Sequence, residues 1–134
     1  MKFGGILIGS EDPIKLKAYY TKLFGKPTFE DQTYFGWQFG ASGIAIGPHD
    51  QVKGKNKEPG RVIWNLEATD VKGEFAKLQR AGATVVKEPY ELGEKGEYLI
   101  ATFSDPDNNF FQIMTPMEAP SSAEESREES AVRR

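Results

Sequence analysis

The sequence predicts an α+β fold built from two consecutive copies of one module, in which a strand and a helix are followed by three strands. Two observations support this repeat. The candidate helices follow Asp12 and Asp70, which are 58 positions apart, and end before Gly25 and Gly82, which are 57 positions apart. Each helix is followed by three apolar segments of strand length, separated by turn residues. A single insertion or deletion therefore aligns the two halves.

The first helix is predicted in the segment DPIKLKAYYTKLFGK, residues 12–26. Asp12 is a suitable N-cap, and Pro13 suits the first helical position because an N–H there would have no helical partner. Gly25 is a typical C-terminal stop. Apolar side chains recur at helical spacing: Leu16, Tyr19, Tyr20, Leu23 and Phe24.

The second helix is predicted in the segment DVKGEFAKLQRAGA, residues 70–83. Its first residue is again an Asp, and Gly82 is again the stop signal. One side of this helix carries the apolar residues Val71, Phe75, Leu78 and Ala81. The second helix therefore repeats the pattern of the first.

The strands of each module are predicted from short apolar runs that end in turn residues. In the first module they are 4–12, 27–30, 34–40 and 42–48; in the second they are 62–70, 84–91, 96–105 and 109–116. A module of this size leaves one face of its sheet open, so the two must pack together or pair with a second chain. We expect one domain over residues 1–117, with modules at 1–49 and 61–117 joined by a hydrophilic linker at 50–60.

Composition and charge exclude several functional classes. The chain has 134 residues, of which 38% are hydrophobic, and a formal net charge of −3. The segment after Met117 has little to bury, so we expect residues 118–134 to be a disordered tail. The rest is nearly neutral, which argues against a nucleic-acid surface.

The N-terminal apolar run is too short for a signal peptide or a membrane span, and the sequence contains no Cys. It therefore offers no disulfide, thiol nucleophile or thiolate metal site. We expect a cytoplasmic protein that has no membrane partner and no nucleic-acid partner.

The paired modules resemble the vicinal oxygen chelate superfamily, which includes glyoxalase I, extradiol dioxygenases and bleomycin-resistance proteins. Three segments carry the resemblance: SEDPIKLKAYYTKLFG, LEATDVKGEFAKLQRAGATVVKEP and FSDPDNNFFQIMTP. The resemblance covers residues 3–117. It implies curved mixed sheets around a central cup, helices on the outside, and a homodimer.

The resemblance also indicates where metal ligands would lie. Ligands are expected seven residues before each helix-opening Asp, at Gly5 and Ile63, and after the final turn, at Gln112. The end of the first module, GIAIGP, lacks the expected Glu. A zinc or iron site needs several N, S or carboxylate donors. We therefore expect no metal and no cofactor.

Strand periodicity places Gln112 on the face opposite Phe111 and Ile113. If these two residues pack under a helix, Gln112 points into the cup. There its amide needs a hydrogen-bond partner, which we expect to be a water or a ligand.

Two more candidates share the strand RVIWNLEAT, in which Val62, Trp64 and Leu66 are expected to form the apolar face. The opposite face carries Ile63, Asn65 and Glu67, which by the resemblance line the cup. Glu67 is a weak candidate for a catalytic base if it is desolvated. The alternative, a solvated carboxylate at a strand end, has equal support.

Trp37 and Tyr98 are candidates for an aromatic wall around a planar ligand, although Trp37 fits a core position slightly better. Three other polar groups have simpler interpretations. His49 is favoured as an exposed loop residue, the segment DPDNN as a tight turn, and the Lys53–Lys57 segment as part of a solvated linker.

The sequence thus favours a metal-free protein that binds a small organic ligand, because an apolar cup with a few polar groups suits a binding site. The alternative is a glyoxalase-like lyase or a dioxygenase-like oxidoreductase with a non-standard site. The candidate ligand-binding residues are Gln112, Asn65, Glu67, Ile63, Gly5, Trp37 and Tyr98.

Overall fold

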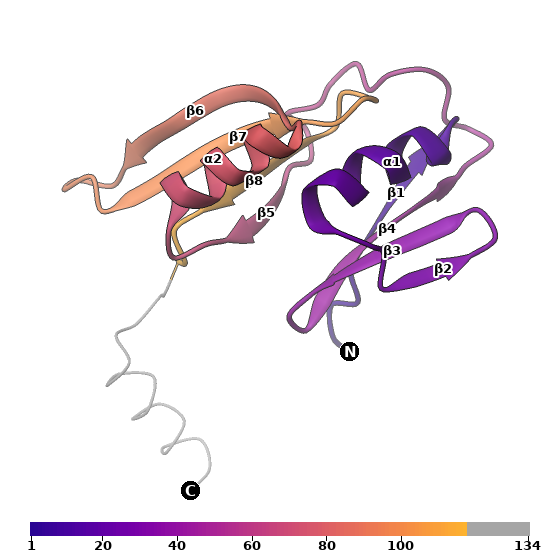
Figure 1. The fold of residues 1–134 in the computed structure, drawn as a ribbon, viewed down its shortest axis with the longest axis horizontal. Coiled ribbons are helices and arrows are strands. Elements are labelled where there is room, and N and C mark those ends of the chain that lie inside the picture. Colours follow the sequence, from indigo (N-terminus) through magenta and orange to yellow (C-terminus); the bar gives the residue numbers. More distant parts are fainter. Residues whose placement is uncertain (118–134) are drawn as a thin grey trace, which may run out of the picture.

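Each half of the chain folds into a strand, a helix and three further strands, as the sequence predicts (Figure 1). The structure, a computed structural model, describes residues 1–117. The first module comprises β1 (Ile6–Ser10), α1 (Pro13–Phe24), β2 (Phe29–Asp31), β3 (Tyr34–Phe39) and β4 (Ser42–Pro48). The second comprises β5 (Trp64–Glu67), α2 (Val71–Ala81), β6 (Thr84–Leu92), β7 (Tyr98–Ser104) and β8 (Phe110–Met114). The predicted disordered tail lies outside the described residues.

The two modules form two separate four-stranded mixed sheets with the same strand order. The first sheet is ordered β1-β4-β3-β2 and the second β5-β8-β7-β6. In each sheet the first strand pairs in parallel with the last strand of its module, and the other pairs are antiparallel. The sheets do not close into a barrel. The α+β fold class with two repeated modules is therefore confirmed.

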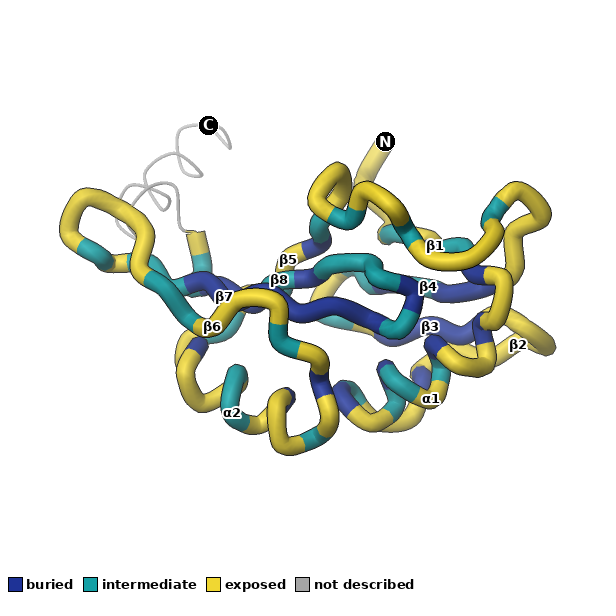
Figure 2. Tube along the Cα trace, turned by 90° about the horizontal axis from the view of Figure 1, so that it is seen from above, coloured by how far each residue is buried: buried dark blue, intermediate teal, exposed yellow. Residues whose placement is uncertain are grey.

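Both helices lie on the same side of the two sheets (Figure 2). The side chains beneath them are buried because strand residues alternate between the two faces. Trp64, Phe111 and Ile113 are 7%, 0% and 2% exposed. Their predicted position on the helix-covered face is confirmed.

Aromatic side chains join the modules into one core. The ring of Tyr20, on α1, lies 5.8 Å from Trp37 in its own module, measured between centroids. It also lies 6.0 Å from Trp64 and 6.1 Å from Phe111 in the second module. Large buried aromatic surfaces contribute strongly to packing energy. Helix α1 therefore contributes to the cores of both sheets.

The helix ends follow the local signals of the sequence. The Asp12 carboxylate accepts a hydrogen bond from the amide N of Lys15, and the Asp70 carboxylate accepts one from the amide N of Gly73. Gly82 has φ of 112°, a left-handed conformation that suits a residue without a side chain.

Strand β5 is shorter than predicted. It begins at Trp64, opposite Phe111 of β8, whereas Val62 precedes it and is 67% exposed. The expectation that Val62 belongs to the apolar strand face is therefore wrong. Pairing with the five-residue strand β8 limits the length of β5, and that partner cannot be read from residues 62–70 alone. None of the described helices is long and apolar enough to cross a membrane.

Candidate functional site

A row of polar side chains crosses the helix-free face of the second sheet. Asn65 of β5 is in register with Gln112 of β8, and Gln112 is in register with Thr102 of β7. Lys87 of β6 extends the row, opposite Thr102. Directly opposed side chains on one sheet face lie close enough to interact. We call Asn65, Gln112, Thr102 and Lys87 the polar row.

Gln112 is half-buried in the polar row, and its Nε2 donates a hydrogen bond to Thr102 Oγ1 at 3.2 Å. The expectation of an amide that only water or a ligand could satisfy is therefore wrong. The partner lies ten positions earlier in the chain, and sheet pairing alone brings it within reach. Within residues 1–117, no hydrogen bond is made to Gln112 Oε1. This oxygen is the acceptor that the row offers to a ligand.

Asn65 and Glu67 are both exposed at the outer edge of the second sheet. The Glu67 carboxylate accepts a hydrogen bond from the amide N of Met117 at 2.9 Å. The side chain is therefore in contact with water at the end of the strand. The position of Glu67 therefore agrees with the solvated alternative rather than with a catalytic base.

Trp37 belongs to the core and does not line the helix-free face. It is 3% exposed, and its Nε1 donates a hydrogen bond to the Gly25 carbonyl at 2.8 Å. The next residue in the strand, Gln38, is the one that faces away from the helices. The expectation of Trp37 as an aromatic wall is corrected on this geometry.

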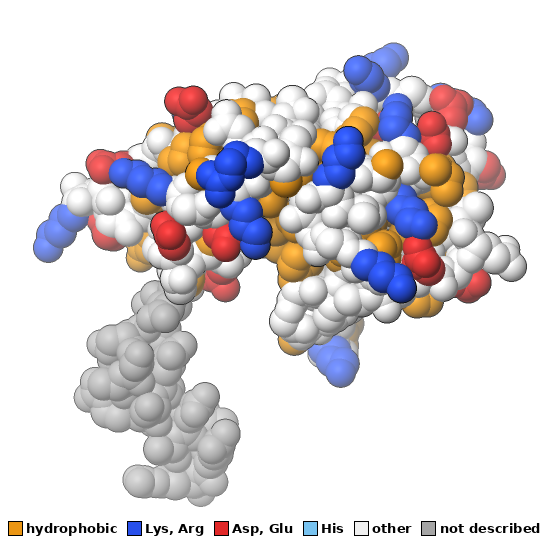
Figure 3. Space-filling view, in the orientation of Figure 1, with side chains coloured by type: hydrophobic (Ala, Val, Ile, Leu, Met, Phe, Trp, Pro, Cys, Tyr) orange, Lys and Arg blue, Asp and Glu red, His pale blue; other side chains and the backbone are white. Residues whose placement is uncertain are grey.

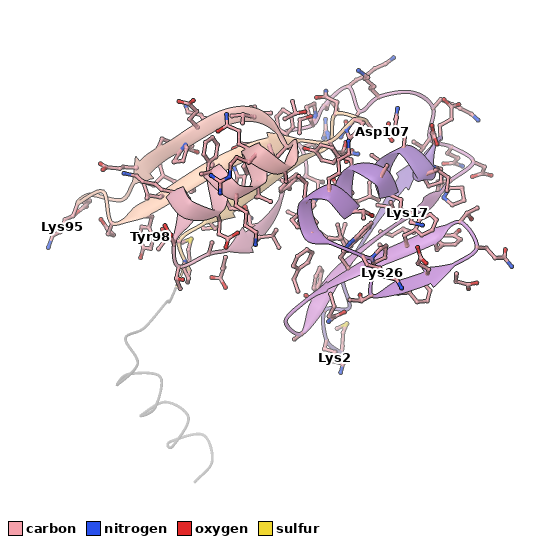
Figure 4. All side chains as sticks on the ribbon, viewed as in Figure 1. Lys2, Lys17, Lys26, Lys95, Tyr98 and Asp107 are labelled. Atoms are coloured by element: carbon pink, nitrogen blue, oxygen red, sulfur yellow. The ribbon has the colours of Figure 1, made fainter. Side chains whose placement is uncertain are left out.

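Tyr98 lies half-buried at the start of β7. It is four residues before Thr102, an even number, and therefore lies on the same face as the polar row. Figure 4 shows it at the end of the second module that is farther from Asp107. A second aromatic residue on this face, Tyr90 of β6, is opposite Ile100, and its ring lies 4.7 Å from Lys87 Nζ.

Sequence reasoning missed three residues on this face: Thr102, Lys87 and Tyr90. Strand β6 has register shifts between Val85 and Lys87 and between Lys87 and Tyr90. A bulge breaks the two-residue alternation on which a face assignment depends. Strand β7 has no such shift at Thr102. The regular alternation of Thr102 with Phe103 is enough to predict that Thr102 lies on the face opposite the core.

The positions matched to metal ligands do not supply a metal centre. Gly5 precedes β1 with φ of 137°, and a Cβ built there would lie 2.6 Å from the Gly43 carbonyl oxygen. A side chain would therefore displace backbone at this position. Ile63 has no donor atom. Within residues 1–117, no group of three or more His, Cys, Asp or Glu side chains converges. The donor set does not fit a divalent metal.

The helix-free face of the first sheet is apolar and rich in small residues. Leu7, Phe29 and Tyr34 are 57%, 52% and 40% exposed. The ring of Tyr34 occupies the space where a Cβ on Gly47 would lie. Beside this surface is a depression of about 410 Å³ whose lining includes Gly5 and Phe29. These side chains form an exposed apolar patch on the first sheet, and such patches are typical of surfaces that bind another molecule.

The DPDNN segment forms a turn, but a buried one. Asp105 and Asp107 are 4% and 6% exposed. The Asp105 carboxylate accepts hydrogen bonds from the backbone N–H groups of Asp107 and Asn109, both at 2.9 Å. Such bonds define a tight turn.

The same turn fastens the second module to α1 of the first. The Tyr20 hydroxyl donates to Asp105 Oδ2 at 2.7 Å, and the Ser10 hydroxyl donates to Asp107 Oδ2 at 2.6 Å. Lys15 Nζ lies 3.2 Å from Asp107 Oδ1. Figure 4 shows Asp107 beside the start of α1. We call Ser10, Tyr20, Asp105 and Asp107 the inter-module latch.

Burial raises the pKa of the Asp105 carboxyl, although hydrogen bonds led by that from Tyr20 oppose the shift. Burial also raises the pKa of the Tyr20 hydroxyl, and the nearby Asp105 adds to that shift. These groups are turned into the core and bonded to one another. The arrangement indicates a structural role.

His49 is exposed in the turn that follows β4. Its Nδ1 accepts a hydrogen bond from the Gln51 amide N at 3.2 Å. The linker is held more firmly than its composition indicates, because Asn56 donates from its amide N to the Asp107 carbonyl at 2.7 Å. Thus part of the linker is docked on the latch.

The comparisons with known proteins agree with this architecture. A family model described as a glyoxalase-like domain matches residues 5–114. The chain belongs to the glyoxalase-like domain family. This match confirms the resemblance to the vicinal oxygen chelate superfamily. No curated protein matches the chain.

Solved structures with the same fold as this glyoxalase-like domain share little sequence with it. A glyoxalase/bleomycin resistance protein/dioxygenase family enzyme from Burkholderia phytofirmans PsJN is 21% identical, with a TM-score of 0.65 over 85% of this chain and 98% of its own. A glyoxalase-related enzyme from Fulvimarina pelagi is 18% identical, with a TM-score of 0.67 over 89% and 94%. A glyoxalase/bleomycin resistance protein from Albidiferax ferrireducens T118 is 19% identical, with a TM-score of 0.65 over 85% and 98%. At these identities the likeness establishes the fold, and the fold hosts several chemistries.

Proposed function

We propose that the protein binds a small organic molecule on the helix-free face of its second sheet, without a metal. The polar row carries this proposal. It has Gln112 where the resemblance expects a carboxylate ligand, and Gln112 Oε1 is an acceptor that the row leaves available. The two other ligand positions are Gly5 and Ile63, which have no donor side chains.

The side chains around the row indicate the kind of ligand. Tyr90 and Tyr98 offer aromatic surface, and Asn65 and Lys87 offer hydrogen-bond donors. Ligand sites combine apolar walls with a few polar groups that fix orientation. The ligand we propose is a planar molecule with a donor for Gln112 and an acceptor or negative charge near Lys87. Glu67 contributes at most a solvated carboxylate at the rim.

We also propose that a second copy of the chain covers the apolar face of the first sheet, giving a homodimer. Leu7, Phe29 and Tyr34 supply exposed apolar surface, and burying such surface is the main driving force for association. We propose in addition that the protein is cytoplasmic. Light scattering tests the assembly: a monomer at high micromolar concentration contradicts it.

A thermal-shift screen of planar organic molecules tests the binding function, since a ligand that binds only the folded state raises Tm by mass action. Calorimetry with a hit should then show that Gln112→Leu weakens binding by about 1–3 kcal/mol, the cost of one lost hydrogen bond to a buried group. Gln79→Leu, on the exposed surface of α2, is the matched control and should bind as well as the unmodified protein.

The enzyme alternative makes a different prediction in the same experiment. Stoichiometric binding of zinc, nickel or iron to the unmodified protein, lost in Gln112→Leu, would contradict the metal-free proposal. Gln112→Glu should not create tight metal binding, because one carboxylate is too few ligands.

A further inference from the structure

An irregularity in β6 places Lys87 on the helix-free face of the second sheet. Val85 of β6 is opposite Phe103 of β7. Thr102, the residue before Phe103, is opposite Lys87, so β6 contains one extra residue between the two pairs. In a regular ladder Val86 would be opposite Thr102. Such an extra residue is a β-bulge, which re-aims side chains and is frequent beside active sites. The bulge puts an ammonium group where a regular strand would put an apolar side chain.

A second irregularity brings an aromatic ring beside Lys87. Thr102 and Ile100 of β7 are two positions apart and share a face, whereas their partners in β6, Lys87 and Tyr90, are three positions apart. Without this shift Pro89 would be opposite Ile100, and Tyr90 would point to the other face. The shift instead places the Tyr90 ring 4.7 Å from Lys87 Nζ. A cation over an aromatic face makes an attractive contact, which holds this ammonium group in place.

Lys87 has no ion-pair partner within residues 1–117. The residue is exposed, and none of the ion pairs in this part of the chain includes it. Glu67, a carboxylate on the same face, belongs to β5 at the opposite edge of the sheet. Three strand spacings, about 14 Å, separate the two strands. The β6 end of the polar row therefore carries a positive charge that no carboxylate of the described residues contacts.

We propose that the ligand of the polar row is a planar aromatic carboxylate with a hydroxyl group at its opposite end. This proposal rests on the proposed function and narrows the ligand to one chemical class. The carboxylate binds Lys87 Nζ, and the hydroxyl group donates to Gln112 Oε1. A carboxylate is favoured over a neutral acceptor because charge-assisted hydrogen bonds are about twice as strong as neutral ones.

The spacing of the strands sets the length of this ligand. β6 and β8 lie on either side of β7, two strand spacings or about 10 Å apart. The para arrangement suits this span, because it holds two polar groups of one ring farthest apart. Beside the row, Ile100 and Met114 are in register on the same face and supply apolar surface for the ring.

Three probes separate the two polar contacts. 4-Hydroxybenzoate carries both groups, benzoate lacks the hydroxyl group, and 4-hydroxybenzamide keeps the hydroxyl group but is uncharged. Calorimetry on the full chain should show that 4-hydroxybenzoate binds at least about tenfold more tightly than the amide, the equivalent of one charge-assisted hydrogen bond. Added salt should weaken the binding of the carboxylate and leave that of the amide unchanged.

Variants of β6 locate the contact with the anion. Lys87→Met should remove the preference for the carboxylate over the amide, and Lys87→Arg should retain it. Tyr90→Leu should reduce this preference, because the ring no longer holds the ammonium group. Lys77→Met is the matched control and should bind all three probes as the unmodified protein does. Lys77 is exposed on α2, on the helix-bearing side of the molecule, where Figure 3 shows basic and acidic side chains interspersed.

Gln112→Leu tests the other contact. It should lose the preference for 4-hydroxybenzoate over benzoate and keep the preference for the carboxylate over the amide. Equal binding of carboxylate and amide to the unmodified protein, or a carboxylate preference that survives in Lys87→Met, would overturn this inference. The proposed function would still stand in either case if Gln112→Leu weakened the binding of the two hydroxyl-bearing probes. If none of the probes binds, this inference is wrong, and the thermal-shift screen with neutral planar molecules decides the proposed function separately.

Discussion

Removing one hydroxyl group from the inter-module latch should measurably weaken the whole domain. In Tyr20→Phe the ring still fills its site, which is 0% exposed, and only the hydrogen bond to Asp105 Oδ2 is lost. Bonds to charged groups contribute about 1.5–3 kcal/mol, because the buried carboxylate cannot turn to water instead. Asn109 Nδ2, at 3.0 Å, still donates to the same oxygen and keeps the loss toward the lower end. We expect a decrease of about 2 kcal/mol in the free energy of unfolding.

Urea denaturation followed by tryptophan fluorescence measures this change, since Trp37 and Trp64 both lie beside Tyr20. Tyr19→Phe is the matched control. Its hydroxyl donates to the Ser104 carbonyl at 2.8 Å and accepts from the amide N of Thr84 at 3.0 Å. Both partners are uncharged, and the exposed Thr84 N–H can bond to water instead, so the loss should be nearer to about 1 kcal/mol. A smaller loss in Tyr20→Phe than in Tyr19→Phe would refute the reasoning. Simple additivity of Tyr20→Phe and Asp105→Asn would refute it as well, because residues in direct contact should couple.

Three further predictions concern a glycine of β4, the N-cap of α2 and the inter-module latch. Gly43→Ala should destabilise the domain strongly, because its Cβ would overlap the Trp37 carbonyl oxygen, whereas Gly4→Ala has nothing within 4 Å and should be nearly neutral; urea midpoints compare the two. Asp70→Ala removes the N-cap of α2 and should cost about 1 kcal/mol in the free energy of unfolding, and an unchanged value would mean that the cap does not hold the helix end. The pKa of Asp105 is raised, so the folded state favours its protonated form. The contribution of this group to stability is therefore present at low pH. It is lost as the pH rises above the ordinary pKa of 3.8 toward the raised pKa. The stability of the unmodified protein relative to Asp105→Asn should therefore fall over that rise in pH, and a relative stability that increases instead would contradict the sign.

The sequence by itself determined the elements whose signals are local. Asp12 and Asp70 cap the helices that follow them, and Gly82 ends the second one, because caps and stops act within one turn of the chain. The alternation around Phe111 also predicted correctly which side of β8 faces the helices, since neighbouring residues of a strand without a bulge point to opposite faces. The repeat of the two modules followed from the spacing of these same signals.

The tertiary structure alone decided how these elements use their polar groups. Gln112 is paired with Thr102 because β8 lies beside β7 in this register, and no pattern within β8 contains that information. Trp37 became core because α1 covers its side of the first sheet. The turn at Asp105 became part of a buried latch because Tyr20 reaches it from 85 positions away in the chain. Burial and partnership depend on contacts between distant segments, so local signals predict the fold of this glyoxalase-like domain better than they predict its site.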